Sequence, residues 1–443
     1  MKKLLLTGLA LVSIATQAQT WVQQNTNYPA ESTMPRDIHA VNASVAWTYA
    51  ADGSGGAANL QQYSRTSNGG TTWTSGAINV GNAALQISDL TAADANTAWV
   101  VINGANQGIW KTSNGGTTWA KQTTALFNQA GSFPNTAYFW DVNNGVVMGD
   151  PDGSAAGGGR FEIYTTSNGG TNWTRVPLAN LPATSNEFGY TTIKAVAGNT
   201  VWFGTDLGRV MKSNDKGLTW TVAGTPIIDF GGVTTPGSNG QITLKDANNA
   251  WVMDQDGLLF NTTNAGTDWE LVNVVSGTIY TSDVKYVPGT VNTLISGGST
   301  ATSRGSSISY DGGANWTDLV PDAVSTDNGI PSIGVFDANT IYGGGFTSAS
   351  GGGINKLGAL LATSNPNAVK NAVNVYPNPT TGQVNIQSKG AVQSVVLVDM
   401  NGKLVKSFQA VSKVDLSNVQ AGVYILNVTL ADGQKTATKL IKK

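Results

Sequence analysis

Residues 66–73 read Thr-Ser-Asn-Gly-Gly-Thr-Thr-Trp, and five later segments of the chain repeat this pattern with few changes. The six segments, called boxes below, span residues 66–73, 112–119, 166–173, 213–220, 262–269 and 309–316, and each ends in tryptophan. Successive boxes lie between 46 and 54 residues apart. A repeat of this length with strand-like flanks is typical of one four-stranded blade of a β-propeller. The sequence therefore predicts an all-β propeller over residues 19–365.

Each box has the chemistry of a tight turn. A Ser or Thr hydroxyl and an Asn or Asp side chain can bond the backbone N–H groups of their own turn. The glycine common to all six copies suits a position with positive φ, and the tryptophan can pack into the blade. We expect a structural role for the shared residues, which are Asn68, Gly70, Trp73, Asn114, Gly116, Trp119, Asn168, Gly170, Trp173, Asp215, Gly217, Trp220, Asn264, Gly266, Trp269, Asp311, Gly313 and Trp316.

These six copies resemble the Asp-box, or BNR, repeat, whose pattern is Ser/Thr-x-Asp/Asn-x-Gly-x-x-Trp. The resemblance implies that each box joins the third and fourth strands of a blade and lies away from the face that binds ligands. Function must then be sought in sites elsewhere on the fold.

A seventh repeat is present in two pieces. A strand, a short polar turn and a second strand recur seven times along the chain, although only six boxes are whole. Thr363-Ser-Asn365 begins a further box, and Thr20-Trp21 looks like the end of one. We therefore predict seven blades with a split closing blade, in which the strand at Trp21 completes the blade that begins at Pro331. Such a ring closure leaves no exposed sheet edge.

Residues 1–18 are typical of a signal peptide. Lys2 and Lys3 precede an apolar run from Leu4 to Ile14, which is too short to span a bilayer, and small residues end at Ala18. No later stretch reaches transmembrane length, so we do not expect an integral membrane protein.

The tail of the chain differs from the repeats. Residues 366–373 form a polar linker, and alternating apolar residues and glycine turns over residues 374–443 predict a small Ig-like β-sandwich. The Tyr376-Pro-Asn-Pro379 start, the Asn401-Gly-Lys403 hairpin and the Leu416-to-Tyr424 segment resemble the type A sorting domain of the type IX secretion system of Bacteroidetes. This resemblance implies the type IX machinery as a partner and a secreted or outer-surface location, reached through the periplasm. An Ig-like adhesive module is the alternative.

Composition excludes several functions. Charged residues make up 12% of the chain and the formal net charge is −2, so a nucleic-acid partner is not expected. The chain has no cysteine, which removes thiol catalysis and cysteine metal sites. Its one histidine, His39, would have to serve any Ser-His-Asp triad, and a lone histidine is more often a packed or surface residue.

One segment departs from the repeats and supplies the candidate ligand-binding residues Asp150, Asp152 and Arg160. It runs Asp150-Pro-Asp-Gly-Ser154 and then through a glycine run to Arg160. Two acids two residues apart could offer oxygen ligands to Ca²⁺, which is the one cofactor we consider, although a full Ca²⁺ loop has further carboxylates. The acids and the arginine could equally bind a polar ligand, or the segment could be an Asp-Pro turn on a long hairpin.

Three Asp-box families bear on function. Sialidases bind a carboxylate through three arginines and carry an Arg-Ile-Pro motif, which residues 34–38, Met-Pro-Arg-Asp-Ile, do not match. Xyloglucan hydrolases place paired acids in a cleft between two propellers, and only one propeller is expected here. The photosystem II assembly factor has seven blades and binds without catalysis.

We therefore expect a secreted or cell-surface propeller that recognises a glycan, a protein or another envelope component. No catalytic residue is assigned, and a binding protein is favoured over an enzyme. An extracellular glycoside hydrolase or lyase acting on polysaccharide is the alternative, and an assembly role resembling that of a chaperone is a third. Trp47, Trp99, Trp202 and Trp251 recur at one strand position, which favours packing between blades over stacking on sugars.

Overall fold

The computed structural model describes residues 19–443 except 57, 130, 155–157, 185, 232–237, 320–328, 359, 361–372, 389, 400–402 and 432–434. The chain divides into two compact units, Met1–Leu360 and Leu361–Lys443. The expected signal peptide and the expected boundary near residue 365 lie outside the described residues. No helix in the described part of the chain is long and apolar enough to cross a membrane.

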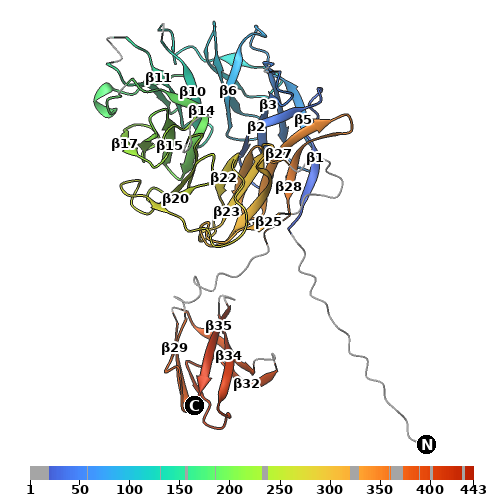
Figure 1. The fold of residues 1–443 in the computed structure, drawn as a ribbon, viewed down its shortest axis with the longest axis vertical. Coiled ribbons are helices and arrows are strands. Elements are labelled where there is room, and N and C mark those ends of the chain that lie inside the picture. The colour runs from blue at the N-terminus through green and yellow to red at the C-terminus, as the bar shows by residue number, and fades with distance from the viewer. Residues whose placement is uncertain are drawn as a thin grey trace, which may run out of the picture. The chain divides into compact units, whose positions relative to one another are not determined.

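The first unit consists, over its described residues, of seven four-stranded antiparallel sheets. Six of them are formed by four strands in chain order, and they are numbered here as blades 1 to 6 (Figure 1). Blade 1 contains β2 (Thr33–Ala40), β3 (Ala46–Asp52), β4 (Gln62–Thr66) and β5 (Thr74–Ala77). Blade 2 contains β6 (Gln86–Ala92), β7 (Ala98–Asn103), β8 (Gly108–Thr112) and β9 (Ala120–Lys121). Blade 3 contains β10 (Pro134–Phe139), β11 (Gly145–Pro151), β12 (Phe161–Thr166) and β13 (Thr174–Arg175).

The next three blades repeat this order. Blade 4 contains β14 (Gly189–Ala197), β15 (Thr200–Thr205), β16 (Arg209–Ser213) and β17 (Thr221–Gly224), and the short 3₁₀-helix η1 (Leu178–Asn180) precedes it. Blade 5 contains β18 (Gln241–Leu244), β19 (Ala250–Met253), β20 (Leu259–Thr262) and β21 (Glu270–Leu271). Blade 6 contains β22 (Asp283–Tyr286), β23 (Leu294–Ser299), β24 (Arg304–Ser309) and β25 (Thr317–Asp318).

Blade 7 closes the ring with strands from both ends of the unit. Its order is β1-β28-β27-β26, with β1 (Trp21–Asn25), β26 (Ile333–Asp337), β27 (Thr340–Ser348) and β28 (Gly351–Leu357). Trp21 pairs with Leu357 in antiparallel register, and Figure 1 shows blue β1 beside orange β28. The Trp21 indole is buried and donates a 2.7 Å hydrogen bond to Ser306 Oγ in blade 6. The predicted seven blades and split closing blade are therefore confirmed, while Thr363 to Asn365 lie outside the described residues.

The core of the propeller lies between neighbouring blades. Trp47, Trp99, Trp202 and Trp251 are buried, as packing between blades requires. The Trp99 indole of blade 2 also donates to the carbonyl of Gly169 in the box of blade 3, and that of Trp251 in blade 5 donates to Gly312 in the box of blade 6. These two boxes are thus held by the blade before them as well as by their own strands.

The second unit is a β-sandwich. One sheet has the order β29-β30-β33, with β29 (Val373–Tyr376), β30 (Gln383–Ser388) and β33 (Lys413–Asp415). The other has the order β32-β31-β34-β35, with β31 (Val392–Asp399), β32 (Leu404–Gln409), β34 (Gly422–Leu430) and β35 (Lys435–Lys442). Side chains of both sheets, among them Val384, Leu397 and Leu426, share one buried core. The predicted sandwich is confirmed, and the Ig-like strand order stays a prediction.

Candidate ligand-binding site

The six boxes each occupy one end of their blade, from blade 1 to blade 6. In blade 1, Thr66 Oγ1 accepts the Gly70 N–H at 2.9 Å and Asn68 Oδ1 accepts the Thr72 N–H at 2.9 Å, and both bonds lie within the turn between β4 and β5. The glycine shared by all boxes has positive φ in each, from 78° to 103°. These side chains are hydrogen-bonded within their own turns, as the structural role expected for the boxes requires.

Asp150 lies at the opposite end of blade 3, in a bulge of β11. Its Oδ1 atom accepts the Asn135 amide at 2.6 Å and the Gly189 N–H at 2.7 Å, which links blade 3 to blade 4. Burial raises the pKa of Asp150 to about 6, against the lowering effect of these two hydrogen bonds.

Asp152 and Arg160 have separate partners. Asp152 accepts hydrogen bonds from the N–H and hydroxyl of Ser154 and forms a 3.0 Å ion pair with Arg175. Burial acts to raise the pKa of Asp152, but the hydrogen bonds from Ser154 and Arg175 outweigh it and the pKa is lowered. Arg160 donates to the Leu181 and Gly158 carbonyls. Within the described residues, no hydrogen bond or ion pair joins any two of the three candidates, and no group of three or more His, Asp or Glu side chains is placed to hold a metal. A Ca²⁺ site here stays a prediction.

A cavity of about 420 Å³ opens where the innermost strands begin. Because strand direction alternates within a blade, this end of the ring is opposite the boxes. The cavity, called the channel mouth below, is lined by residues of blades 1, 4, 5, 6 and 7, including Arg36, Tyr190, Gln241, Asp283 and Ser332. Its lining is mainly polar and carries both signs of charge, so it can donate to and accept from a polar ligand.

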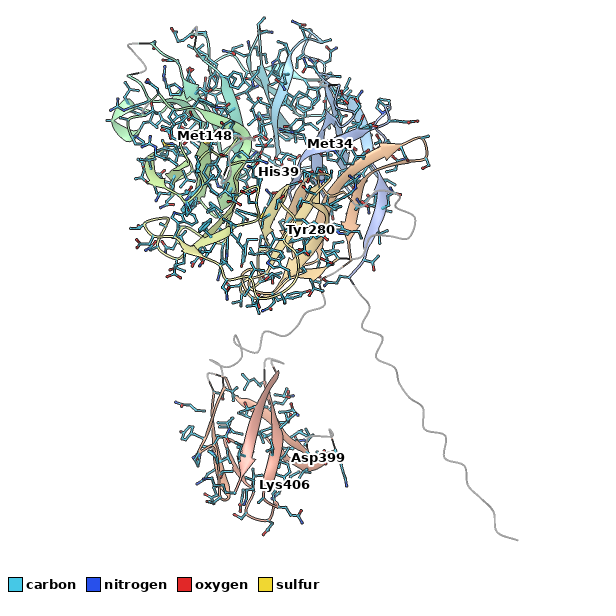
Figure 2. All side chains as sticks on the ribbon, in the orientation of Figure 1. Met34, His39, Met148, Tyr280, Asp399 and Lys406 are labelled. Carbon is cyan, nitrogen blue, oxygen red and sulfur yellow. The ribbon has the colours of Figure 1, made fainter. Side chains whose placement is uncertain are left out.

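A deeper cavity of about 170 Å³ continues along the inner strands and shares Asp37, Thr192 and Lys285 with the channel mouth. Met34 lines the mouth and His39 lines the deeper cavity; both belong to β2 (Figure 2). Burial and, less strongly, the charge of Lys194 lower the pKa of His39 to about 4, so this histidine is neutral at physiological pH. It packs against Tyr138 with ring centroids 5.5 Å apart.

Ion pairs between blades cross the channel. Lys194 of blade 4 lies 2.6 Å from Asp89 Oδ2 of blade 2 and 3.5 Å from Asp37 Oδ2 of blade 1. Burial opposes the charge of Lys194, but the two carboxylates outweigh it and raise the pKa of this lysine. Lys285 pairs with Asp283 at 2.8 Å, and Asp283 also accepts the Ile333 N–H of blade 7. The Lys194 pairs thus join the inner strands of blades 1, 2 and 4, and Asp283 joins those of blades 6 and 7.

Sequence reasoning missed these charged residues, although a signal exists. An aspartate immediately precedes a buried apolar residue in three inner strands, at Asp37-Ile38, Asp89-Leu90 and Asp283-Val284. The recurrence at one position of the repeat points to the channel, since the first strand of a blade lines it.

Each of the two units is similar to a known family. Residues 374–443 match the family model described as the secretion system C-terminal sorting domain, and residues 70–238 match that of the photosynthesis system II assembly factor YCF48. The structure of YCF48 bound to a D1 peptide is similar, with a TM-score of 0.52 and 15% identity over 77% of this chain and 97% of that chain. YCF48 from Cyanidioschyzon merolae gives a TM-score of 0.52 and 16% identity over 76% of this chain and 98% of that chain. No curated protein matches the chain.

The fold and these matches define the class as an Asp-box β-propeller. More particularly, the chain resembles YCF48-like propellers and carries a C-terminal type IX sorting domain. Such a domain interacts with the secretion machinery, and it directs the protein to the cell surface or to the medium.

Proposed function

We propose that this exported propeller is a binding protein that holds a polar ligand, a polypeptide or a glycan, at the channel mouth. The observation that carries the proposal is the polar cavity of about 420 Å³ formed by five blades at the end opposite the boxes. Concave sites with a few convergent polar groups are where proteins usually bind ligands. YCF48, a propeller of similar fold, has been solved bound to a D1 peptide, which supports a polypeptide ligand.

Variants of the mouth test this function. Gln241→Ala and Arg36→Ala each remove one polar side chain that lines the cavity, while Asp268→Asn changes an exposed carboxylate in the box of blade 5. Capture of envelope proteins and binding to a glycan array should fall for the mouth variants and remain for Asp268→Asn. Capture that is equal for all three variants would refute a site at the mouth. Asp150→Asn, Asp152→Asn and Arg160→Ala, assayed alongside, test these residues as ligand contacts.

A hydrolase is the second candidate, favoured by two carboxyl groups of the same cavity. Burial raises the pKa of Asp283, whereas the charges of Lys194 and Lys285 lower that of Asp37 in spite of its burial. Carboxyl groups whose pKa values move apart can serve as the acid and the base of a glycosidase. Release of reducing sugar from polysaccharide that disappears in Asp37→Asn and Asp283→Asn would establish this activity, and Asp150→Ala and Asp152→Ala test the earlier candidates in the same assay.

A further inference from the structure

Three large apolar side chains are exposed on the mouth end of blade 4. Phe188, Leu207 and Ile228 have 44%, 46% and 57% of their surface exposed. They come from the segment before β14, the β15–β16 hairpin and the segment after β17. Large apolar side chains that gather on a surface mark sites of interaction with other molecules. We call these three residues the blade 4 rim.

The rim is held in place by backbone bonds. The Asp206 N–H donates to the Phe188 carbonyl at 3.1 Å, and the Phe188 N–H donates to Asp206 Oδ1 at 2.9 Å. The Thr225 N–H donates to the Gly208 carbonyl at 3.0 Å. Gly208 has a φ of 62°, and a Cβ atom there would lie 1.8 Å from the Ile227 carbonyl oxygen, so the hairpin packs directly against the segment that carries Ile228. The three apolar residues therefore stand on mutually bonded segments.

Three carboxylates that form no salt bridge within the described residues lie next to the rim segments. Asp150, Asp206 and Asp229 form no ion pair within the described residues. Arg209 is also influenced by the charge of Asp206, but its guanidinium is hydrogen-bonded to Glu187, whose Oε1 atom lies 3.0 Å from Arg209 Nε. Burial and, less strongly, the charges of Glu187 and Asp229 raise the pKa of Asp206. A positive charge brought to this surface would relieve that repulsion.

The rim is continuous with the channel mouth. Tyr190 lines the mouth, lies 5.3 Å from Phe188 between ring centroids, and donates a 2.7 Å hydrogen bond to Asp229. Acidic residues also outnumber lysines and arginines over residues 19–360, whereas lysines outnumber acidic residues over residues 374–443. The propeller thus has an excess of negative charge of its own.

We propose that the blade 4 rim is a docking surface for a polypeptide segment that carries an apolar side chain next to a lysine or arginine. The inference rests on the proposed binding function and names the class of its ligand. The apolar side chain covers Leu207 and Ile228, and the cation lies between Asp206 and Asp229. Charge complementarity selects a polypeptide, because neutral and acidic glycans carry no cation to meet these carboxylates.

Peptide titrations test the docking surface. The exported protein is titrated with labelled decapeptides of alternating Leu and Lys, Leu and Glu, or Ser and Lys, and anisotropy is measured. The Leu-Lys peptide should bind at least about tenfold more tightly than the other two. Ile228→Ser and the double variant Asp206→Asn with Asp229→Asn should each weaken it about tenfold, as the loss of a central contact does. Two controls match these changes: Leu271→Ser removes an equally exposed apolar side chain from β21, and Asp268→Asn removes a carboxylate from a box.

The outcomes separate the docking surface from the proposed function. The docking surface is contradicted if the Leu-Glu peptide binds as tightly as the Leu-Lys peptide. It is also contradicted if Ile228→Ser and Leu207→Ser bind the Leu-Lys peptide fully while their unfolding curves are unchanged. Retained capture of envelope proteins by rim variants, together with loss of that capture in Gln241→Ala, would also contradict the docking surface but would support a site at the channel mouth. If rim and mouth variants all capture as well as Asp268→Asn does, both proposals fail.

Discussion

Lys194 Nζ in blade 4 lies 2.6 Å from Asp89 Oδ2 in blade 2, so the two charges meet across the channel although 105 residues separate them. Both side chains are nearly or fully shielded from solvent. Asp89 also accepts the Ala137 N–H of blade 3, which makes its carboxylate a junction of three blades. The channel is therefore held by charge pairs as well as by apolar packing between blades.

Removal of the lysine should destabilise the propeller strongly. In Lys194→Met the buried Asp89 carboxylate loses its cation, and breaking a buried pair in this way costs about 3–5 kcal/mol. Urea unfolding should show this loss, whereas Lys121→Met, near the surface, should change the unfolding free energy by less than about 0.5 kcal/mol. The double variant Lys194→Met with Asp89→Asn should recover part of the stability; a double variant as unstable as the single one would contradict the pairing.

The contributions of Asp150 and Asp152 to the stability of the fold should change with pH in opposite directions. The pKa of Asp150 is raised to about 6, so the folded state binds the proton more tightly and the contribution of this group to stability falls as pH rises from about 4 to 6. The pKa of Asp152 is lowered, so its contribution is present above its unfolded pKa and is lost as pH falls below about 4. The unfolding free energies of the wild type, Asp150→Asn and Asp152→Asn are measured from pH 3 to 7. The difference between the wild type and Asp150→Asn should fall as pH rises, whereas the difference between the wild type and Asp152→Asn should increase. Slopes of the same sign would be inconsistent with the two environments.

Ring closure should depend on the N-terminal strand. Trp21→Ala removes a buried indole and its bond to Ser306, and such truncations cost about 3–5 kcal/mol. Val22→Ala on the same strand is the control, because the Val22 side chain is 52% exposed and its loss should cost less than about 1 kcal/mol. Urea unfolding measures both. Amide exchange should also accelerate in β28, the partner of β1, and similar losses for the two variants would argue against a closing role for Trp21.

The repeat predicted the ring because its period, its box chemistry and its two split pieces depend on local sequence. Box glycines with positive φ and the pairing of Trp21 with β28 follow from that pattern alone. The partners of the channel charges could not be predicted from this pattern. Which carboxylates pair with Lys194 depends on how the blades are arranged around the closed ring. The sequence also could not predict which way the side chains of Asp150 and Asp152 point. A bulge between Gly149 and Pro151 breaks the alternation of side chains along β11.

Photo-crosslinking from the two ends of the ring shows directly whether a ligand binds at the channel mouth. A photoreactive phenylalanine replaces either Ser299, which lines the mouth, or Thr267, which is exposed in the box of blade 5, and the exported protein is irradiated on its own cells. A ligand at the channel mouth should give a discrete adduct from position 299 and none from position 267. Adducts from position 267 alone, or none from either position, would contradict it.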